Sequence, residues 1–500
     1  MSLKVALQDL PQRLDAAEAV ALAYPQELAE LAAALQRGLP CLVECAKELA
    51  PFLFLNLRDR LKTHGLRCVY VDGRPGPEEK PSPLTPGFLG RLLAQLRDAV
   101  RGPLEQRVVV LPHLDLLVGG GPGLSSEARE ATALLLENPG LLWVGFRDPT
   151  ISLPRVVEEL TPCRFRVLGV ERARLGQLVT RAEGRKFGAD VDVGALHRQV
   201  SGANAVRLRR LLSTLDREDL PAEPQCALAE LRRLTLAGSL AVPEETFGDV
   251  GGYADIKQRL HEDVLAVLAR IDAAESAEER ARLERLLPRG LIFAGPSGTG
   301  KRLFARALAN AVGAALLETS GSELKSRYVG GSEENLRQLF WRARQAAPSL
   351  ILFHEIDSFA GPPGRNTGPV EPSMRVQLLQ ELDALPHGEL VLVAATTRDR
   401  VSLDPALLQP GRFELVLEVG APSTEDRRDI LTRLGDALDL RFNPKALAWA
   451  VDHTAGVSER PPWHGARLQA LCRALARQRL REGRADETQQ PDVKRALASL

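Results

Sequence analysis

The residues best suited to chemistry lie in the stretch LIFAGPSGTGKR (residues 291–302), where an apolar run leads into glycines and a lysine. The spacing G-x-x-x-x-G-K, from Gly295 to Lys301, is that of a phosphate-binding P-loop. Glycines let backbone N–H groups turn inward around phosphate oxygens, and the lysine reaches the β- and γ-phosphates. The sequence from Lys301 onward favours a helix, whose N-terminus adds the positive end of its dipole. The predicted phosphate-binding residues are Gly295, Pro296, Ser297, Gly298, Thr299, Gly300 and Lys301.

One position of this motif departs from its usual chemistry. The residue after a P-loop lysine is ordinarily Ser or Thr, whose hydroxyl binds Mg²⁺, but here it is Arg302. The planar fork of an arginine pairs bidentately with phosphate oxygens. Two interpretations stay open: the guanidinium lies near the phosphates and replaces part of the charge of the ion, or it points to solvent from the first turn of the helix.

The composition limits the class of protein. The chain has 500 residues, 44% hydrophobic and 26% charged, with 65 Lys+Arg against 65 Asp+Glu. This length suggests about two to four domains, and the balanced charge gives no evidence for a nucleic-acid partner. The six cysteines show no C-x-x-C spacing, which favours buried thiols in a reducing compartment. No apolar run approaches the roughly 18 residues of a membrane span, and the first residues lack a signal-peptide pattern, so we expect a cytoplasmic protein.

The N-terminal half alternates strand-like and helical segments. Apolar runs at 40–44, 67–71, 107–111, 141–146 and 163–167 predict strands, and segments such as 46–61 and 88–100 predict helices between them. This alternation is typical of a parallel sheet covered on both faces. The first run is followed by Glu44-Cys45-Ala46-Lys47-Glu48, which contains no glycine for a phosphate cradle. Lys47 is either a relic phosphate lysine or, as a helical lysine normally is, solvated. We expect this lobe to bind no nucleotide.

Motifs that surround the P-loop in the C-terminal half resemble a known family. They are DVGG (249–252), SRYVGGSEENLRQLF (326–340), LILFHEID (350–357), LVAATTR (392–398) and LDPALLQPGRF (403–413). In this order they resemble the AAA ATPases, the family of the valosin-containing protein, katanin and the proteasomal ATPases, over about residues 245–480. The arrangement of a degenerate P-loop-like lobe followed by one AAA module is similar to the layout of the two-lobed bacterial and plastid AAA proteins.

The resemblance implies an α/β fold class. We expect a P-loop NTPase parallel sheet with helices on both faces and a C-terminal helical lid, preceded by a degenerate P-loop-like α/β lobe. The expected domains are a degenerate lobe (1–215), a linker with a docking helix (216–244), an AAA nucleotide-binding domain (245–420) and a helical lid (421–500). The resemblance also implies ATP or ADP as the bound nucleotide and places Gly251 and Gly252 near its adenine.

The resemblance further implies roles at the carboxyl ends of the strands. Glu355 would orient the attacking water, Thr397 would act as the polar sensor, and Arg412 would reach the phosphate of a neighbouring subunit. The aspartate that normally precedes this glutamate, and that holds Mg²⁺ through water, is replaced by His354. Because Arg302 and His354 occupy both usual ligand positions, we predict no protein-held metal and weak hydrolysis.

The resemblance finally implies a ring that acts on protein clients. Tyr328, Val329 and Gly330 fit the pore loop that grips a polypeptide in a hexameric ring. We expect a homo-oligomer, or a mixed ring with an intact AAA subunit. Two functions stay open: a ring-forming ATPase that remodels or translocates proteins, and a pseudo-ATPase scaffold or assembly factor that binds nucleotide with little turnover.

Overall fold

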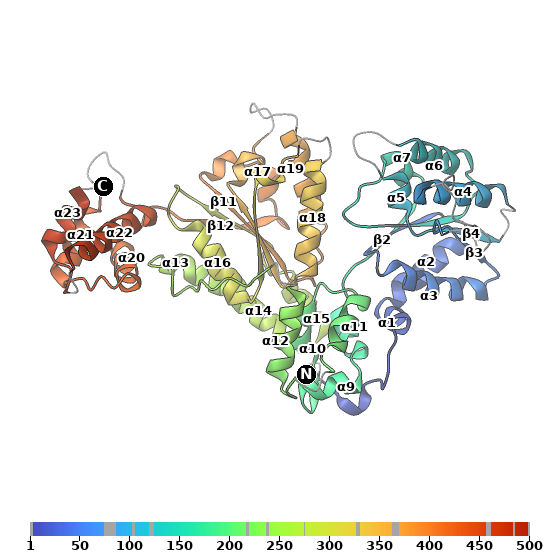
Figure 1. Cartoon of the computed structure of the whole chain (residues 1–500), viewed down its shortest axis with the longest axis horizontal. Helices are drawn as coiled ribbons and strands as arrows, with labels where there is room; N and C mark the ends of the chain where they lie inside the picture. Colours follow the sequence, from blue (N-terminus) through green and yellow to red (C-terminus); the bar gives the residue numbers. More distant parts are fainter. Residues whose placement is uncertain are drawn as a thin grey trace. The chain divides into compact units, whose positions relative to one another are not determined.

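The computed structural model describes residues 4–74, 87–102, 106–119, 125–216, 220–236, 240–274, 276–326, 331–362, 370–456, 462–483 and 486–498 (Figure 1). The chain forms two compact units. The first contains residues 1–239 with the segments 324–347 and 388–390, and the second contains residues 240–323, 348–387 and 391–500. Within the described residues, none of the helices combines the length and the apolar character that crossing a membrane requires.

The first unit is built around a parallel sheet of five strands in the order β3-β4-β5-β2-β6. Its strands are β2 (Cys41–Cys45), β3 (Arg67–Tyr70), β4 (Arg107–Leu111), β5 (Trp143–Arg147) and β6 (Cys163–Val167). All five fall where the apolar runs predict them, within about two residues at each end. A separate antiparallel pair joins β1 (Lys4–Ala6) to β7 (Asp190–Asp192).

Helices cover both faces of this sheet, because alternate residues along each strand point to opposite sides. Val108 and Val110 pack with the helices α1 to α3, whereas Val109 and Leu111 pack with α4 to α6 (Figure 1). The helices before the linker are α1 (Ala16–Ala23), α2 (Pro25–Gln36), α3 (Ala50–Thr63), α4 (Phe88–Arg101), α5 (Leu114–Val118), α6 (Ser126–Glu137), α7 (Arg155–Glu159), α8 (Arg172–Leu175), α9 (Arg181–Gly184), α10 (Val193–Val200) and α11 (Ala205–Ser213). Two more helices complete the unit, α12 (Pro224–Thr235) and α18 (Gly331–Gln345).

The second unit contains another parallel sheet of five strands, in the order β12-β8-β11-β10-β9. Its strands are β8 (Gly290–Ala294), β9 (Ala315–Ser320), β10 (Ser349–His354), β11 (Val391–Thr397) and β12 (Phe413–Glu418). Every residue of β8 and β11 is buried, which is typical of central strands in a sheet covered on both faces. The helices here are α13 (Ala254–Leu260), α14 (Ala266–Ala273), α15 (Ala277–Glu284), α16 (Lys301–Val312), α17 (Gly321–Leu324) and α19 (Val370–Asp383), and a π-helical turn (His261–Leu265) joins α13 to α14.

The C-terminal helices form a small bundle in the place expected for the lid. They are α20 (Thr424–Ala437), α21 (Pro444–His453), α22 (Gly465–Glu482) and α23 (Gln490–Ala498). Their apolar faces share one hydrophobic cluster with β8, α13 and α16. Ser423 closes a capping box with Asp426 at the start of α20, which fixes where this bundle begins.

The two sheets have the same connectivity. If the strands of each sheet are numbered along the chain, both sheets have the spatial order 5-1-4-3-2. In both, the first strand therefore lies next to the fourth, and the turn after it opens at the carboxyl edge. Parallel sheets bind ligands at this edge, near the point where the strand order reverses. The structure thus shows that the N-terminal half repeats the topology of the C-terminal half.

Candidate functional site

The glycine-rich turn leads from buried β8 into α16, as the sequence predicts. Gly295, Gly298 and Gly300 have φ values of +143°, +82° and +98°, a region that residues with a Cβ atom rarely adopt. A Cβ atom on Gly295 would lie 2.1 Å from the carbonyl oxygen of Val419, whereas one on Gly300 would meet nothing within 4 Å. The turn therefore packs closely against β12 on one side and leaves open space at the N-terminus of α16.

Lys301 is folded back over this turn. Its Nζ donates to the carbonyl oxygens of Gly295 at 2.6 Å and Pro296 at 2.7 Å. Burial lowers the pKa of Lys301, while the nearby carboxylate of Glu355 acts in the opposite direction. Both acceptors are neutral, so this ammonium group has no ion-pair partner at the turn that would compete with a phosphate.

The lid contributes two groups to the same turn. The backbone N–H of Ala466, in the first turn of α22, donates to the carbonyl oxygen of Gly298 at 2.9 Å. The ring of His464 lies beside it, because a Cβ atom on Gly298 would be 2.6 Å from the His464 Nδ1. This Nδ1 is buried and has no hydrogen-bond partner among the described residues. An open glycine turn and an unsatisfied polar atom beside it fit a bound polar ligand such as a nucleotide.

His464 is not among the binding residues that the sequence predicts. The lone signal in the sequence is that a histidine directly precedes the helix that approaches the P-loop.

Gly251 and Gly252 lie against the first helix of the lid. A Cβ atom on Gly251 would be 2.7 Å from the Ile430 Cα, and Gly252 has a φ of +67°. The Gly252 N–H donates to the Asp429 carboxylate at 2.7 Å, and the Tyr253 N–H donates to Asp426 at 2.6 Å. The two glycines thus couple the start of the AAA segment to the lid, and their placement near adenine remains a prediction.

Glu355 directly follows His354, the last residue of β10, and has an unusual backbone. Its φ of 47° and ψ of 56° are left-handed, a conformation that costs a non-glycine residue about 1–3 kcal/mol and is concentrated at functional sites. The Thr396 hydroxyl accepts a hydrogen bond from the Glu355 N–H at 3.1 Å. The exposed Glu355 carboxylate pairs with Arg398 at 3.2 Å. The backbone therefore directs this carboxylate away from the core, at the carboxyl edge of the sheet.

Thr397 ends β11 next to the P-loop, since its carbonyl oxygen accepts from the Gly295 N–H at 3.2 Å. Its buried hydroxyl donates to the carbonyl oxygen of Asp399 at 3.0 Å and therefore closes a local turn. In this structure the Thr397 hydroxyl hydrogen-bonds to the backbone of its own turn, and its role as a sensor remains a prediction.

Arg412 forms a bidentate ion pair with Asp383. Its Nε and Nη2 donate to the two carboxylate oxygens, each at 2.8 Å, and its Nη1 donates to the carbonyl oxygen of Ala406 at 2.7 Å. The hydrogen bonds from Arg412 lower the pKa of Asp383. To reach a neighbouring subunit, as predicted, Arg412 would have to exchange Asp383 for phosphate oxygens.

The two positions that usually hold Mg²⁺ carry groups that do not suit it. Arg302 donates to the carboxylate of Glu318 on β9, and the same carboxylate lies 3.4 Å from the His354 Nε2. Mg²⁺ prefers hard oxygen ligands in near-octahedral geometry. Within the described residues, no group of three or more His, Cys, Asp or Glu side chains could hold a metal ion. The residues here therefore do not fit Mg²⁺.

The equivalent turn in the first unit has different chemistry. Residues 46–49 form a turn rather than the start of the predicted helix, and α3 begins only at Ala50. The Lys47 Nζ donates to the fully buried Asp115 carboxylate at 2.5 Å and to the carbonyl oxygen of Pro112 at 3.0 Å. The prediction of a solvated helical lysine was therefore wrong, because a buried carboxylate draws the ammonium group inward.

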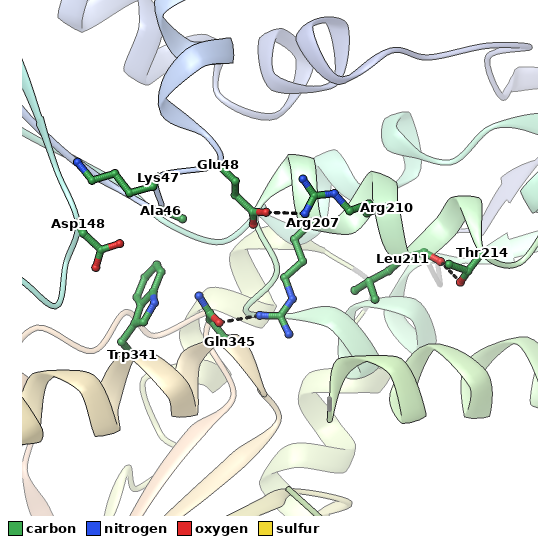
Figure 2. Close-up of a pocket in the computed structure, with 10 residues that line it drawn as sticks. All are labelled: Ala46, Lys47, Glu48, Asp148, Arg207, Arg210, Leu211, Thr214, Trp341 and Gln345. Carbon is green, nitrogen blue, oxygen red and sulfur yellow. Dashed lines mark hydrogen bonds and ion pairs between the residues drawn. The ribbon is translucent and has the colours of Figure 1, made fainter. Parts of the chain in front are cut away.

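A cavity of about 630 Å³ opens beside this turn, within the first unit (Figure 2). Its walls come from the turn itself, from Asp148 after β5, and from α11 and α18. Arg207 donates to Gln345 at 2.8 Å, and Arg210 donates to Glu48 at 3.0 Å (Figure 2). The turn lacks glycine and both arginines already have partners, so nothing in it reproduces the cradle of the second unit.

The predicted pore-loop residues Tyr328, Val329 and Gly330 lie outside the residues that the structure describes. The pore-loop assignment therefore remains a prediction.

Comparisons with known proteins agree with this geometry. A family described as "ATPase family associated with various cellular activities (AAA)" matches residues 291–421, from β8 to the end of the sheet. Among curated relatives, Protein CdcH of Halobacterium salinarum is 33% identical over 391 residues, covering 73% of this chain and 50% of CdcH. The Cell division cycle protein 48 homolog of Archaeoglobus fulgidus is 37% identical over 242 residues, covering 48% of this chain and 31% of that protein. Peroxisomal ATPase PEX6 of Mus musculus is 34% identical over 410 residues, covering 73% of this chain and 40% of PEX6.

The chain thus spans half or less of the length of these relatives. The matched segment nevertheless contains the parallel sheet, the glycine turn with Lys301, and Glu355 directly after β10. Together the sheet order, the turn and the matches show that this chain contains a domain of the AAA family of ATPases.

Proposed function

We propose that this chain binds ATP or ADP in its second unit and works as a subunit of a ring that remodels or translocates protein clients, with weak hydrolysis. The observation that carries the proposal is the open glycine turn at the carboxyl edge of the sheet, with Lys301 held over two neutral carbonyl oxygens. The relatives named CdcH, Cell division cycle protein 48 homolog and Peroxisomal ATPase PEX6 support an ATPase of this class.

In this proposal each group of the site has one task. The Lys301 ammonium and the backbone N–H groups of Gly298 and Gly300 bind the phosphates of the substrate. Glu355 orients the attacking water, and its left-handed backbone holds the carboxylate at the edge of the sheet. Arg412 supplies positive charge to the site of a neighbouring subunit after leaving Asp383. An arginine in this role is worth about 10³–10⁵ in rate.

Slow turnover follows from the groups at the metal position. A divalent ion stabilises the charge that develops in phosphoryl transfer by several kcal/mol. Arg302 and His354 replace both side chains that would hold it, and the Arg302 guanidinium is paired with Glu318. Binding should be affected less, since the glycine turn and Lys301 are intact.

Phosphate release by the full chain, with and without EDTA, tests the proposed activity. We expect slow release that Glu355→Gln abolishes, because an amide cannot accept the proton of the attacking water as a carboxylate does. Loss of release with nucleotide affinity unchanged would support the assignment of Glu355. Equal release by the wild type and by Glu355→Gln would contradict it.

A second function, a nucleotide-binding scaffold or assembly factor without turnover, is favoured by the ion pair at the metal position. In that case release would be absent, while ATP would still promote assembly in sedimentation experiments. A mixed ring with an intact AAA subunit would appear as a second AAA chain captured together with Glu355→Gln in the presence of ATP.

A further inference from the structure

One carboxylate organises the metal position. Glu318 accepts from Arg302 Nη2 through Oε2 and from Arg306 Nη1 through Oε1 at 3.3 Å, and its Oε2 lies 3.4 Å from His354 Nε2. The Glu318 side chain is only 20% exposed, and that of His354 only 25%. Three nitrogen-bearing side chains thus converge on a single, largely covered carboxylate.

The fold explains this convergence. In β9, Leu316, Glu318 and Ser320 share one face, and the parallel register pairs Ser320 with His354 at the end of β10. Paired residues of parallel strands point to the same side, so Glu318 and His354 lie on the face that α16 covers. Arg302 and Arg306 are one turn apart on α16 and therefore point in the same direction. Neither the helix nor the strand has to distort for the four side chains to meet.

The charges of this cluster balance without a metal ion. The Arg306 guanidinium also lies 2.8 Å from the Glu245 carboxylate, so two arginines face two glutamates around a histidine. A hydroxyl and an aspartate in place of Arg302 and His354 would instead leave one arginine against three carboxylates, so that two negative charges would remain for Mg²⁺ to compensate. The Glu318 carboxylate, which could otherwise face a metal ion, already pairs with Arg302 and lies beside His354.

We infer that the Arg302–Glu318–His354 cluster occupies the positions of the side chains that would hold a divalent ion, so that this site binds metal-free nucleotide, and that Glu318 limits the positive charge that Arg302 offers to the phosphates. Glu318 pairs with the Arg302 guanidinium close to His354 and thereby balances its charge. This inference rests on the proposed nucleotide binding and specifies the form of nucleotide that the site accepts.

The first test is the affinity of the full chain for a fluorescent ATP analogue, measured in excess Mg²⁺ and in EDTA. We expect the two dissociation constants to agree within about twofold, because no side chain of the cluster ligates the ion. The variant Arg302→Thr with His354→Asp restores two oxygen groups and releases the Glu318 carboxylate. In this variant Mg²⁺ should tighten binding by about tenfold or more.

The second test isolates Glu318. Glu318→Gln keeps the shape of the side chain but removes the charge that balances Arg302, so metal-free ATP should bind about threefold to tenfold tighter. A variant that only damaged the fold would weaken binding instead. The matched control is Glu130→Gln, which removes an ion pair with Arg97 in the first unit and should leave the affinity unchanged.

The outcomes separate the inference from the proposed function. Wild-type binding that is about tenfold tighter with Mg²⁺ would overturn metal exclusion while leaving nucleotide binding intact. An unchanged or weakened affinity in Glu318→Gln would overturn the inference that Glu318 offsets the charge of Arg302. No binding by the wild type in either condition would contradict the proposed function itself.

Discussion

Two lysines, Lys47 and Lys301, follow the first strand of their respective sheets, but their ammonium groups have different partners. Lys47 is paired with the fully buried carboxylate of Asp115, whereas Lys301, among the described residues, donates to two neutral carbonyl oxygens of its own turn. A buried carboxylate that loses its cation is costly, and a neutral carbonyl near solvent is not. The first lysine is therefore structural, and the second is available to a ligand.

This contrast gives a matched pair of variants. Lys47→Ala should lower the free energy of unfolding by about 1–3 kcal/mol, because Asp115 loses its charged partner, and should leave nucleotide binding in the second unit unchanged. Lys301→Ala should abolish nucleotide binding and shift stability by less than about 0.5 kcal/mol. Urea unfolding and ATP binding would be measured on both variants. Loss of nucleotide binding in Lys47→Ala would contradict the assignment.

His464 leads to a second prediction at the residue scale. Its buried Nδ1, unsatisfied among the described residues, lies beside Gly298, so we expect it to hydrogen-bond the nucleotide. His464→Ala should weaken ATP binding about fivefold to thirtyfold, equivalent to about 1–2 kcal/mol. The control is His453→Ala in the same lid, since His453 stacks on Trp449 away from the turn. Equal affinities of His464→Ala and the wild type would refute this role.

At the scale of elements, local pattern alone predicts most strands and lid helices. The apolar run of β4 and the alternating apolar and charged residues of β6 place both strands at their observed limits, because both patterns are local. The helix predicted from residue 46 begins only at Ala50, since Lys47 is drawn to Asp115, a residue distant in sequence. The strands β1 and β7 were not predicted, because each is stabilised by pairing with the other, which lies far away in the sequence.

For the site, too, the sequence predicts the residues of local motifs but not the contacts between distant segments. The sequence motif predicts the glycine turn and Lys301. The departures from that motif identify Arg302 and His354 as altered positions. The Glu318 pairing was not, because it arises from the register of β9 against β10 and the packing of α16. The local sequence of β9, in which three polar residues follow three apolar ones, does not mark Glu318 as the partner of Arg302.

The contact between α20 and the Gly251-Gly252 turn carries a pH dependence. Burial opposes ionisation of Asp426, but hydrogen bonds from Tyr253 and Ser423 outweigh it and hold its pKa below the usual 3.8. A depressed pKa means that this carboxylate stabilises the contact above its unfolded pKa, and that the stabilisation is lost as the pH falls through the folded value.

Hydrogen exchange at the Tyr253 amide, which donates to Asp426, measures this effect directly. Corrected for the intrinsic effect of pH, its protection should be constant near neutrality and fall in the acid range below the unfolded pKa of 3.8. Asp426→Asn should lower protection already at neutral pH, while Asp436→Asn, an exposed position of the same helix, should not. Equal protection in all three proteins would show that Asp426 does not hold the turn.

At the scale of the whole molecule, each of the two units has buried apolar clusters of its own among the described residues. The clusters of the first unit use residues up to Leu231, and that of the second begins at Val250. Each core contains reporter thiols: Cys41 and Cys45 in the first unit and Cys472 in the second, all at most 1% exposed. Burial raises the pKa of each of these thiols to about 12, so they react only after their own core opens.

Pulsed thiol labelling along a denaturant series should therefore report on each unit separately. ATP should raise the denaturant midpoint for Cys472, because a ligand stabilises the unit that binds it. The midpoints for Cys41 and Cys45 should not move, and Lys301→Ala should remove the shift at Cys472. The partly buried Cys68, Cys163 and Cys226 should react before these thiols at all concentrations. A shift at Cys41 alone would place the nucleotide in the wrong unit.

The central claim is that one glycine turn binds nucleotide without a metal ion, while the equivalent turn of the first unit binds none. Calorimetric titration of the full chain with ATP in EDTA tests it most directly. The account predicts saturable binding of about one nucleotide per chain, abolished by Lys301→Ala and retained in Lys47→Ala. Binding seen only after Mg²⁺ is added, or about two nucleotides per chain, would contradict it.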